Sequence, residues 1–415
     1  MHEFVHAKSQ TPASFTETAS NRFTCPKQAF IFRETAVGEI PAEHPLGVGR
    51  GDHRCGERYT EKMSQINNKT TGSGAGNSRA VARLQQIMGS IVADSSATRD
   101  APHSHRVPEA GVYVPAVTLF DPETDKLCLD DQAKYYSYLA STGLRGLVIL
   151  GTNAETFLLT RDERATLLKL ARQSVPAGFP IIAGVGGHST AQVLEYIADA
   201  HAAGADYALV LPCAYFGKQT TPKVVENFYN QVAAASQLPI IIYNFPAVCN
   251  GLDLDSEIMT TLAQKNPNIV GVKLTCGSVG KITRLAATFM PSRFAIFGGQ
   301  SDFLVGGLAA GSAGCIAAFG NIFPKTCVKI FDLWSAGKYD QALALQKIAA
   351  HAESPTKAGI ANTKYAAAIF TAPRAGITSA EPYFAPRRPY EEPADAVKLK
   401  IREVMTPMNE VEATL

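Results

Sequence analysis

The stretch NPNIVGVKLTCGS, residues 266–278, decides the fold class. Its centre, Ile269–Val272, is apolar or small at every position, which is typical of a strand buried on both faces within a parallel sheet. The run continues directly into Lys273, and the chain then turns at Cys276-Gly277. Because an ammonium group at the end of a buried strand loses hydration, the position of Lys273 requires a chemical explanation.

Seven further short apolar runs lie on either side of this stretch. In chain order they are GVYVPAVTLF (111–120), GLVIL (146–150), PIIAGV (180–185), DYALVLP (206–212), PIIIYN (239–244), FAIFGG (294–299) and GCIAAF (314–319). Together with 268–273 they predict eight strands separated by helices, the pattern of a (β/α)8 TIM barrel. The alternative, an open doubly wound sheet, would carry a glycine-rich phosphate turn after its first strand, and TLFDPETD (118–125) is not such a turn.

The segments between the runs carry helix-start signals. Thr160-x-x-Glu163 and Ser189-x-x-Gln192 predict capping boxes, in which the first side chain and the fourth satisfy each other's backbone N–H groups. Thr221-Pro222 places proline at the first position of a helix, where its missing N–H has no consequence. These signals support helices after the second, third and fourth strands.

The chain divides into three predicted regions. Residues 1–107 mix Gly, Ser, Thr, Asn and charges without a sustained period, so we expect a disordered leader with one helix near 79–93. Residues 108–335 form the barrel. Residues 336–415 form a C-terminal helical extension and tail that pack outside it.

Composition limits the classes of protein that remain. The hydrophobic content of 46% and charged content of 18% fit a globular protein, and a net charge of +2 predicts neither a nucleic-acid nor a membrane partner. Eight scattered cysteines without a CxxC pair predict reduced thiols. We expect a cytoplasmic location, because the N-terminal residues lack the apolar segment of a secretory signal; a mitochondrial location is the less favoured alternative.

The ends of the predicted strands carry the residues that suggest chemistry, because active sites of such barrels form at those ends. Lys273 ends one strand, Tyr243 ends the strand before it, and Gly151-Thr152-Asn153 follows the second strand. A lysine near a strand end is more often ion-paired or solvated at its tip. A phenol and a polar turn beside it favour another interpretation, in which the desolvated amine forms a Schiff base with the ketone of a 2-keto acid.

Four motifs in this order resemble the dihydrodipicolinate synthase / N-acetylneuraminate lyase family of class I aldolases: GTNAE (151–155), YNFP (243–246), GVKLTCG (271–277) and GSAGCIAAFGN (311–321). The resemblance covers Val112 to Pro389. Within the family, the GTN, GLDL and GVKLTCG segments are most similar to 4-hydroxy-2-oxoglutarate aldolases and fungal 2-keto-3-deoxy-L-galactonate aldolases.

The resemblance implies roles for individual residues. It makes Lys273 the Schiff-base lysine and Tyr243 the proton-transferring phenol, both catalytic. It makes Thr152 and Asn153, with Gly151 before them, the residues that bind the pyruvyl carboxylate. Gly298 and Ser301, at the end of the seventh strand, are further candidates for substrate binding; glycine is also common at strand ends for conformational reasons.

The chain departs from the family pattern at three positions. Val248 stands where the synthase branch has an arginine, which argues against dihydrodipicolinate synthase activity. Ala154 replaces a usual glycine, and Ala214 replaces a second tyrosine of the proton relay. Tyr215, adjacent to Ala214, is the residue we expect to substitute for that tyrosine.

The resemblance therefore implies an aldehyde-lyase that cleaves a 2-keto-4-hydroxy acid, such as 4-hydroxy-2-oxoglutarate or a 2-keto-3-deoxy sugar acid, to pyruvate and an aldehyde. It implies no cofactor and no metal, a small-molecule 2-keto acid as substrate, and a homo-oligomer, either a tetramer or a dimer. Three alternatives remain: dihydrodipicolinate synthase, an imine-dependent dehydratase, and a catalytically idle barrel that acts as a binding protein. The identity of the aldehyde half stays open.

Overall fold

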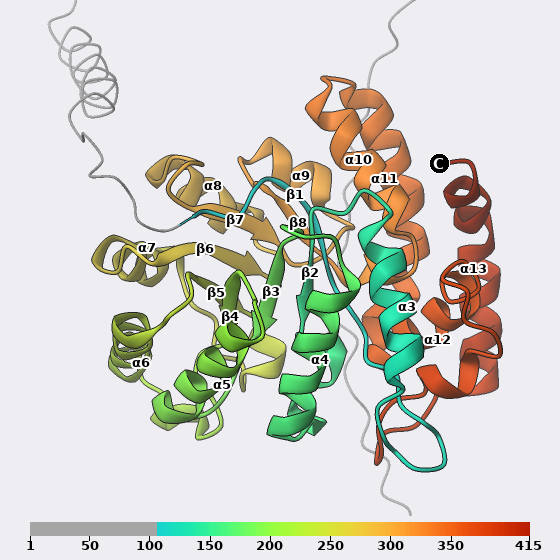
Figure 1. Cartoon of the computed structure of the whole chain (residues 1–415). Helices are drawn as coiled ribbons and strands as arrows, with labels where there is room; N and C mark the ends of the chain where they lie inside the picture. Colours follow the sequence, from blue (N-terminus) through green and yellow to red (C-terminus); the bar gives the residue numbers. More distant parts are fainter. Residues whose placement is uncertain (1–105) are drawn as a thin grey trace, which may run out of the picture. The chain divides into compact units, whose positions relative to one another are not determined.

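Eight parallel strands close into a barrel in the computed structural model, which describes residues 106–415 (Figure 1). Each strand pairs with its neighbours in the chain, and β8 pairs with β1 to complete the ring. The strands are β1 Gly111–Pro115, β2 Gly146–Ile149, β3 Ile181–Gly184, β4 Tyr207–Val210, β5 Ile240–Asn244, β6 Ile269–Leu274, β7 Ala295–Gly298 and β8 Gly314–Ile316. All eight predicted strands and the barrel are confirmed. Most strands are shorter than the apolar runs, because the last residues of those runs leave the ladder and enter loops.

One helix follows each strand and covers the outside of the barrel (Figure 1). These helices are α3 Leu129–Ala140, α4 Arg161–Ser174, α5 Thr190–Ala202, α6 Pro222–Ala235, α7 Ser256–Lys265, α8 Val279–Thr288, α9 Leu304–Ala309 and α10 Pro324–Ser335. Each buries one apolar stripe against the strands. In α4, for example, Leu167, Leu168 and Ala171 are buried.

The predicted helix starts are confirmed, with one difference in detail. Thr160 and Glu163 form the reciprocal capping box of α4, and Thr221 caps α6 with Pro222 at its first position. At α5 the Ser189 side chain accepts the N–H of Gln192, as predicted. The Gln192 side chain, however, accepts the N–H of His188 at 2.9 Å, so the predicted capping box is not reciprocal. The extended backbone at Ser189 brings the N–H of the preceding residue within reach of that amide.

Two apolar clusters form the core. The larger one joins the outer faces of the strands to the surrounding helices. The smaller one fills the inside of the barrel with alternate residues of the strands, including Tyr113, Ile182, Ile241 and Phe297. The barrel interior is therefore closed, and chemistry is confined to the strand ends and their loops.

Three further helices form the predicted C-terminal extension: α11 Tyr339–Glu353, α12 Ile360–Phe370 and α13 Asp395–Ala413. They contact one another and α10, on one side of the barrel (Figure 1). Short 3-10 turns lie at Ser354–Ala358 (η6) and Glu381–Phe384 (η7). The predicted leader, with its helix near 79–93, lies outside the described residues except for Arg106 and Val107.

Candidate active site

Lys273 lies near the carboxyl end of β6, directly opposite Tyr243 of β5. The register between the two strands shifts after Ile240, so that β6 carries Val270 as one extra residue, a β-bulge. Because side chains alternate along a strand, this extra residue decides which face Lys273 occupies. Val270 and Tyr243 belong to the interior cluster and Val272 to the outer one. Lys273 therefore shares the inner face with Tyr243.

Gly271 permits the bulge. A Cβ atom at this position would lie 2.6 Å from the carbonyl oxygen of Ala295 on β7, closer than real Cβ atoms approach backbone. The glycine in GVK is thus required by a close contact between strands. Bulges of this kind commonly redirect a side chain next to a functional site.

The amine of Lys273 is the central feature of the site. The side chain is 2% exposed, and its Nζ lies 4.2 Å from the centre of the Tyr243 ring, which is 3% exposed. Three lysines are buried among residues 106–415. Lys281 and Lys364 each contact a carboxylate, Asp253 and Glu155 respectively. Lys273 has no carboxylate within 4.0 Å in the described part of the chain.

The turn after β2 reaches the same place. The Thr152 hydroxyl lies 3.3 Å from the Tyr243 hydroxyl, within hydrogen-bond distance. Thr152–Ala154 form the 3-10 turn η1, whose first N–H groups have no acceptor inside the turn. Asn153 is the middle residue of this turn and is partly exposed. Amine, phenol, hydroxyl and a polar turn thus meet at one end of the barrel.

Strained backbone frames this turn. Leu150 before it and Glu155 after it adopt left-handed conformations, with φ of 64° and 56°. For residues other than glycine such conformations cost about 1–3 kcal/mol and concentrate at functional sites. On the neighbouring strand, Gly184 at the end of β3 makes room for the turn: a Cβ there would lie 1.9 Å from the Leu150 carbonyl oxygen.

Ala154, which replaces the family's usual glycine, fits without strain. The positive φ of the turn falls on Glu155, so position 154 does not require a glycine. Ala154 is buried, and its carbonyl oxygen accepts a hydrogen bond from the Thr118 hydroxyl at 2.9 Å. The departure therefore leaves the shape of the turn intact.

Glu155, the last residue of the GTNAE motif, was expected to support its loop, but the sequence did not indicate its partners. Glu155 accepts a hydrogen bond from Lys364 of α12 at 2.6 Å and another from the backbone N–H of Arg387 at 2.8 Å. Both partners lie in the C-terminal extension, far along the chain, and no local motif marks them. Lys364 is fully buried, and burial lowers its pKa to about 8 although Glu155 acts in the opposite direction.

A second support lies behind β5. Asn244, next to Tyr243, donates to Asp253 at 2.7 Å and accepts from the N–H of Leu254 at 3.0 Å. Asp253 in turn binds Lys281 of α8. This network fixes the loop after β5. Asp253 and Leu254 belong to the GLDL segment, residues 251–254, whose resemblance to the family does not by itself indicate these contacts.

Gly298 and Ser301 have structural contacts of their own. A Cβ at Gly298 would lie 2.9 Å from the Phe303 ring. The buried Ser301 hydroxyl donates to Glu353 of α11, and its carbonyl oxygen accepts from Gln346 at 2.7 Å. Their part in substrate binding stays a prediction.

Tyr215 lies in the loop after β4 in a row of aromatic side chains. Its ring contacts are with His188 and Phe216, and His188 stacks on Phe157 at 5.6 Å. Tyr215 is 69% exposed, whereas the neighbouring Ala214 is buried in the interior cluster. The one-residue shift thus turns the phenol toward the surface of this chain, and the relay role of Tyr215 stays a prediction.

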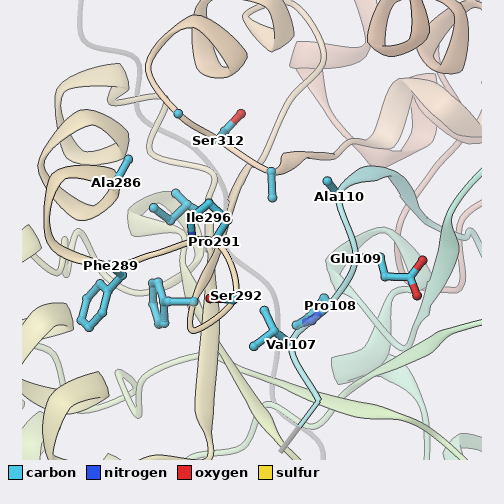
Figure 2. A pocket seen from close by; sticks show the side chains of 13 residues that line it. Val107, Pro108, Glu109, Ala110, Ala286, Phe289, Pro291, Ser292, Ile296 and Ser312 are labelled. Carbon is cyan, nitrogen blue, oxygen red and sulfur yellow. The ribbon is translucent and has the colours of Figure 1, made fainter. Parts of the chain in front are cut away.

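A large cavity lies at the other end of the barrel. It measures about 720 Å³ and is lined by residues that precede β1, β7 and β8, including Val107, Pro108, Pro291 and Ser312 (Figure 2). It contains none of the candidate site residues. A smaller cavity of about 480 Å³ is lined by Thr152 and Glu155 and also by the start of α12. Chemistry, rather than size, therefore identifies the site.

Residues 106–415 contain neither a candidate metal site nor a candidate membrane-spanning helix. Among residues 106–415 no group of three His, Cys, Asp or Glu side chains could hold a metal ion. The described cysteines are free thiols, and Cys276, three residues after Lys273, is partly buried. None of the helices between residues 106 and 415 combines the length and apolar character of a membrane span.

Comparison with known proteins agrees with this geometry. A sequence model described as the Dihydrodipicolinate synthetase family matches residues 108–373. The chain belongs to this family. Members of the dihydrodipicolinate synthetase family act on small molecules, as the names of the relatives below also indicate.

Two curated relatives each match about three quarters of this chain. A protein of Coccidioides immitis, provisionally named a mitochondrial 4-hydroxy-2-oxoglutarate aldolase, is 63% identical over 310 residues, 75% of this chain and 99% of its own length. The L-threo-3-deoxy-hexylosonate aldolase of Hypocrea jecorina is 37% identical over 321 residues, 74% of this chain and 98% of its own length. A crystal structure of a dihydrodipicolinate synthase family protein from Coccidioides immitis superposes with a TM-score of 0.72 at 61% identity, covering 75% of this chain and 99% of that one.

Proposed function

We propose that this chain is a class I aldolase that cleaves a 2-keto-4-hydroxy acid to pyruvate and an aldehyde through an imine on Lys273. The observation that carries the proposal is the amine of Lys273, buried over the Tyr243 ring and without a carboxylate partner among the described residues. Buried lysines are normally ion-paired, as Lys281 and Lys364 are. An unpaired one is available as a nucleophile.

The first half of the reaction forms the imine. Lys273 Nζ attacks the C2 ketone to give a carbinolamine, and Tyr243 donates its proton to the departing hydroxyl, which leaves as water. The product is an iminium ion beside a phenolate. The turn at Thr152 and Asn153 binds the acid end of the substrate through backbone N–H groups and side chains, which fixes C2 against the amine.

The second half breaks the carbon–carbon bond. The Tyr243 phenolate accepts the proton of the 4-hydroxyl, the C3–C4 bond breaks, and its electron pair moves into the iminium to give an enamine and a free aldehyde. Tyr243 then returns the proton to C3. Water adds at C2, its proton passes to Tyr243, and collapse of the carbinolamine releases pyruvate and regenerates Lys273. Acid–base assistance of this kind contributes on the order of 10²–10⁴-fold.

Two substrates are supported by the names of the relatives: 4-hydroxy-2-oxoglutarate and a 2-keto-3-deoxy sugar acid. Val248 lies in a 3-10 turn after β5, is 44% exposed, and cannot replace the arginine that the synthase branch uses to hold its aldehyde substrate. This supports an aldolase over dihydrodipicolinate synthase. The barrel, 108–335, would then carry the catalytic groups, and 336–415 would support them.

The decisive experiment is intact mass after borohydride reduction with pyruvate, for the wild type and for Lys273→Ala. We expect one reduced pyruvyl adduct per wild-type chain, mapped by peptide digestion to Lys273 rather than to Lys281 or Lys364, and none on the variant. A folded wild type without an adduct would refute the imine and favour a binding protein.

Substrate tests then separate the remaining alternatives. Cleavage of either candidate acid would release pyruvate and an aldehyde in equal amounts. A dehydratase would release no aldehyde, and dihydrodipicolinate synthase would consume pyruvate only with aspartate semialdehyde. Each outcome is distinguished by measuring both products.

We also propose that the protein is a homo-oligomer, a dimer or a tetramer. The support is the exposed row at the barrel mouth, where Phe157, Tyr215 and Phe216 are each at least half exposed. Light scattering of the wild type and of Tyr215→Ser tests this: a monomeric wild type would contradict it.

The compartment is a further proposal. We retain the cytoplasm as the expected location, although the relative from Coccidioides immitis carries the word mitochondrial in its name. A fluorescent fusion of the full chain, imaged against a mitochondrial marker, distinguishes the two locations.

A further inference from the structure

Lys364 is a buried lysine that the proposed reaction does not use. It lies on α12 and is 0% exposed. Its Nζ contacts Glu155 Oε1 at 2.6 Å and lies 4.6 Å from the centre of the Phe120 ring. The carboxylate compensates the buried ammonium for its lost hydration, so Lys364 and Glu155 hold each other in place.

Glu155 directly follows the turn that contains Thr152 and Asn153. Its own N–H donates to the Thr152 carbonyl oxygen at 3.0 Å, and its carbonyl oxygen accepts from the Leu158 N–H at 2.8 Å. Its left-handed backbone is unfavourable for a glutamate, so external contacts must stabilise it. Both of its carboxylate oxygens are bound by the C-terminal extension, one by Lys364 and the other by the N–H of Arg387.

The turn transmits this restraint to the reacting groups. Thr152, whose carbonyl oxygen the Glu155 N–H contacts, places its hydroxyl 3.3 Å from Tyr243. Tyr243 lies opposite Lys273 in the sheet. Four contacts in series therefore connect a helix outside the barrel with the amine inside it: Lys364 with Glu155, Glu155 with Thr152, Thr152 with Tyr243, and Tyr243 with Lys273.

We propose that Lys364 is a positioning residue: through Glu155 it holds the turn at Thr152 and Asn153 in the shape that binds the acid end of the substrate. This inference rests on the proposed function, because the turn matters only if a carboxylate binds there. The structure of the pair also indicates why the C-terminal extension contacts the barrel at this loop. The extension completes the binding site from the outside.

The test compares three variants of the full chain. Lys364→Met removes the ammonium and keeps most of the apolar stem, and Lys364→Arg keeps the charge. Glu412→Gln is the control: Glu412 is equally buried, 1% exposed, and accepts from Thr326 at the start of α10 without contacting the turn. The readout is the pyruvate concentration that gives half-maximal reduced adduct, measured at a temperature where circular dichroism shows each variant folded.

We expect Lys364→Met to raise that concentration about 10- to 100-fold, as displacement of a substrate-binding group by about 1 Å does. The maximal amount of adduct should be retained, since Lys273 is unchanged. The half-maximal pyruvate concentration of Lys364→Arg should be closer to the wild-type value than that of Lys364→Met. For Glu412→Gln the same concentration should be within about twofold of the wild-type value. A loss of stability alone would affect Glu412→Gln in the same way.

Two results separate this inference from the function on which it rests. If the wild type forms the adduct and folded Lys364→Met has an unchanged half-saturation, the positioning role is wrong and the aldolase stands. If the wild type forms no adduct, the proposed function itself is refuted. Should Lys364→Met remain unfolded, Glu155→Gln replaces it, because the amide keeps the shape of the side chain and an acceptor for the N–H of Arg387.

Discussion

Lys273 near the carboxyl end of β6 and Lys364 in α12 are both buried, but their surroundings differ in charge. Lys273 has a phenol ring beside it and no carboxylate within 4.0 Å among the described residues, whereas Lys364 is bound to Glu155 at 2.6 Å. The paired lysine is restrained by its partner and restrains the partner in return. The unpaired lysine remains free to react. Burial alone therefore does not distinguish the two amines; the presence or absence of a counter-charge does.

The first way to test this comparison is to remove the phenol beside the unpaired lysine. Tyr243→Phe keeps the ring over Lys273 and removes the group that transfers protons. We expect the rate of aldol cleavage to fall on the order of 10²–10⁴-fold, while borohydride with pyruvate still yields adduct on Lys273. A variant that retains more than about a tenth of the wild-type rate would exclude Tyr243 as the proton-transferring group.

The second test makes the same substitution at both lysines. Lys364→Met leaves Glu155 buried without its cation, so the free energy of unfolding should fall by about 3–5 kcal/mol. Lys273→Met leaves no carboxylate unpaired and should change it by less than about 1 kcal/mol. Urea unfolding measures both. Equal losses at the two positions would mean that pairing does not distinguish these lysines.

The third test changes the bulge that orients Lys273. In Gly271→Ala the new methyl group lies 2.6 Å from the Ala295 carbonyl oxygen, so β6 or β7 must shift. We expect a loss of about 1–3 kcal/mol in stability and slower adduct formation. Gly306→Ala is the matched control, since nothing lies within 4 Å of a Cβ there. If both substitutions behave alike, the close contact at Gly271 has no influence on the site.

The smallest effect concerns pH. Burial lowers the pKa of Lys364 to about 8, against about 10.4 in an unfolded chain. Between these values the unfolded chain holds a proton that the folded chain lacks, so the contribution of Lys364 to the free energy of unfolding increases with pH. Glu155 is the carboxylate that faces it, and Arg387 lies nearby with Glu163 and Asp125. The stability of the wild type minus that of Lys364→Met should therefore rise from pH 8 to pH 10; a flat or falling difference would contradict this.

Much of the fold and the centre of the site could be predicted from local sequence. The eight apolar runs determined the strands, because strands buried on both faces leave a continuous apolar signal. Neighbouring parallel strands in turn bring the ends of those runs together, which is why Tyr243 and Lys273 could be expected to meet. The bulge at Val270 was not predicted, although the interior position of Lys273 depends on it.

The contacts made by long-range pairing could not be predicted. Lys364 is one charged residue in an alanine-rich helix, and nothing in TKYAAAIF indicates that it binds Glu155. Ser301 was expected near substrate from its place after a strand, yet its hydroxyl contacts Glu353 on α11. In both cases the partner is set by how α11 and α12 dock on the barrel, which single-sequence patterns do not encode.

The two hydrogen bonds from the C-terminal extension to Glu155 can form only late in the synthesis of the chain. A ribosome makes the turn at Thr152–Ala154 early, but Lys364 and Arg387 follow Glu155 by 209 and 232 residues. All eight strands leave the ribosome before either anchor does, and chains fold progressively as they emerge. A nascent barrel can therefore close while the turn at Thr152–Ala154 still lacks both contacts from the C-terminal extension. On the positioning role proposed for Lys364, a prematurely terminated chain would be a closed barrel that binds the acid end of its substrate weakly.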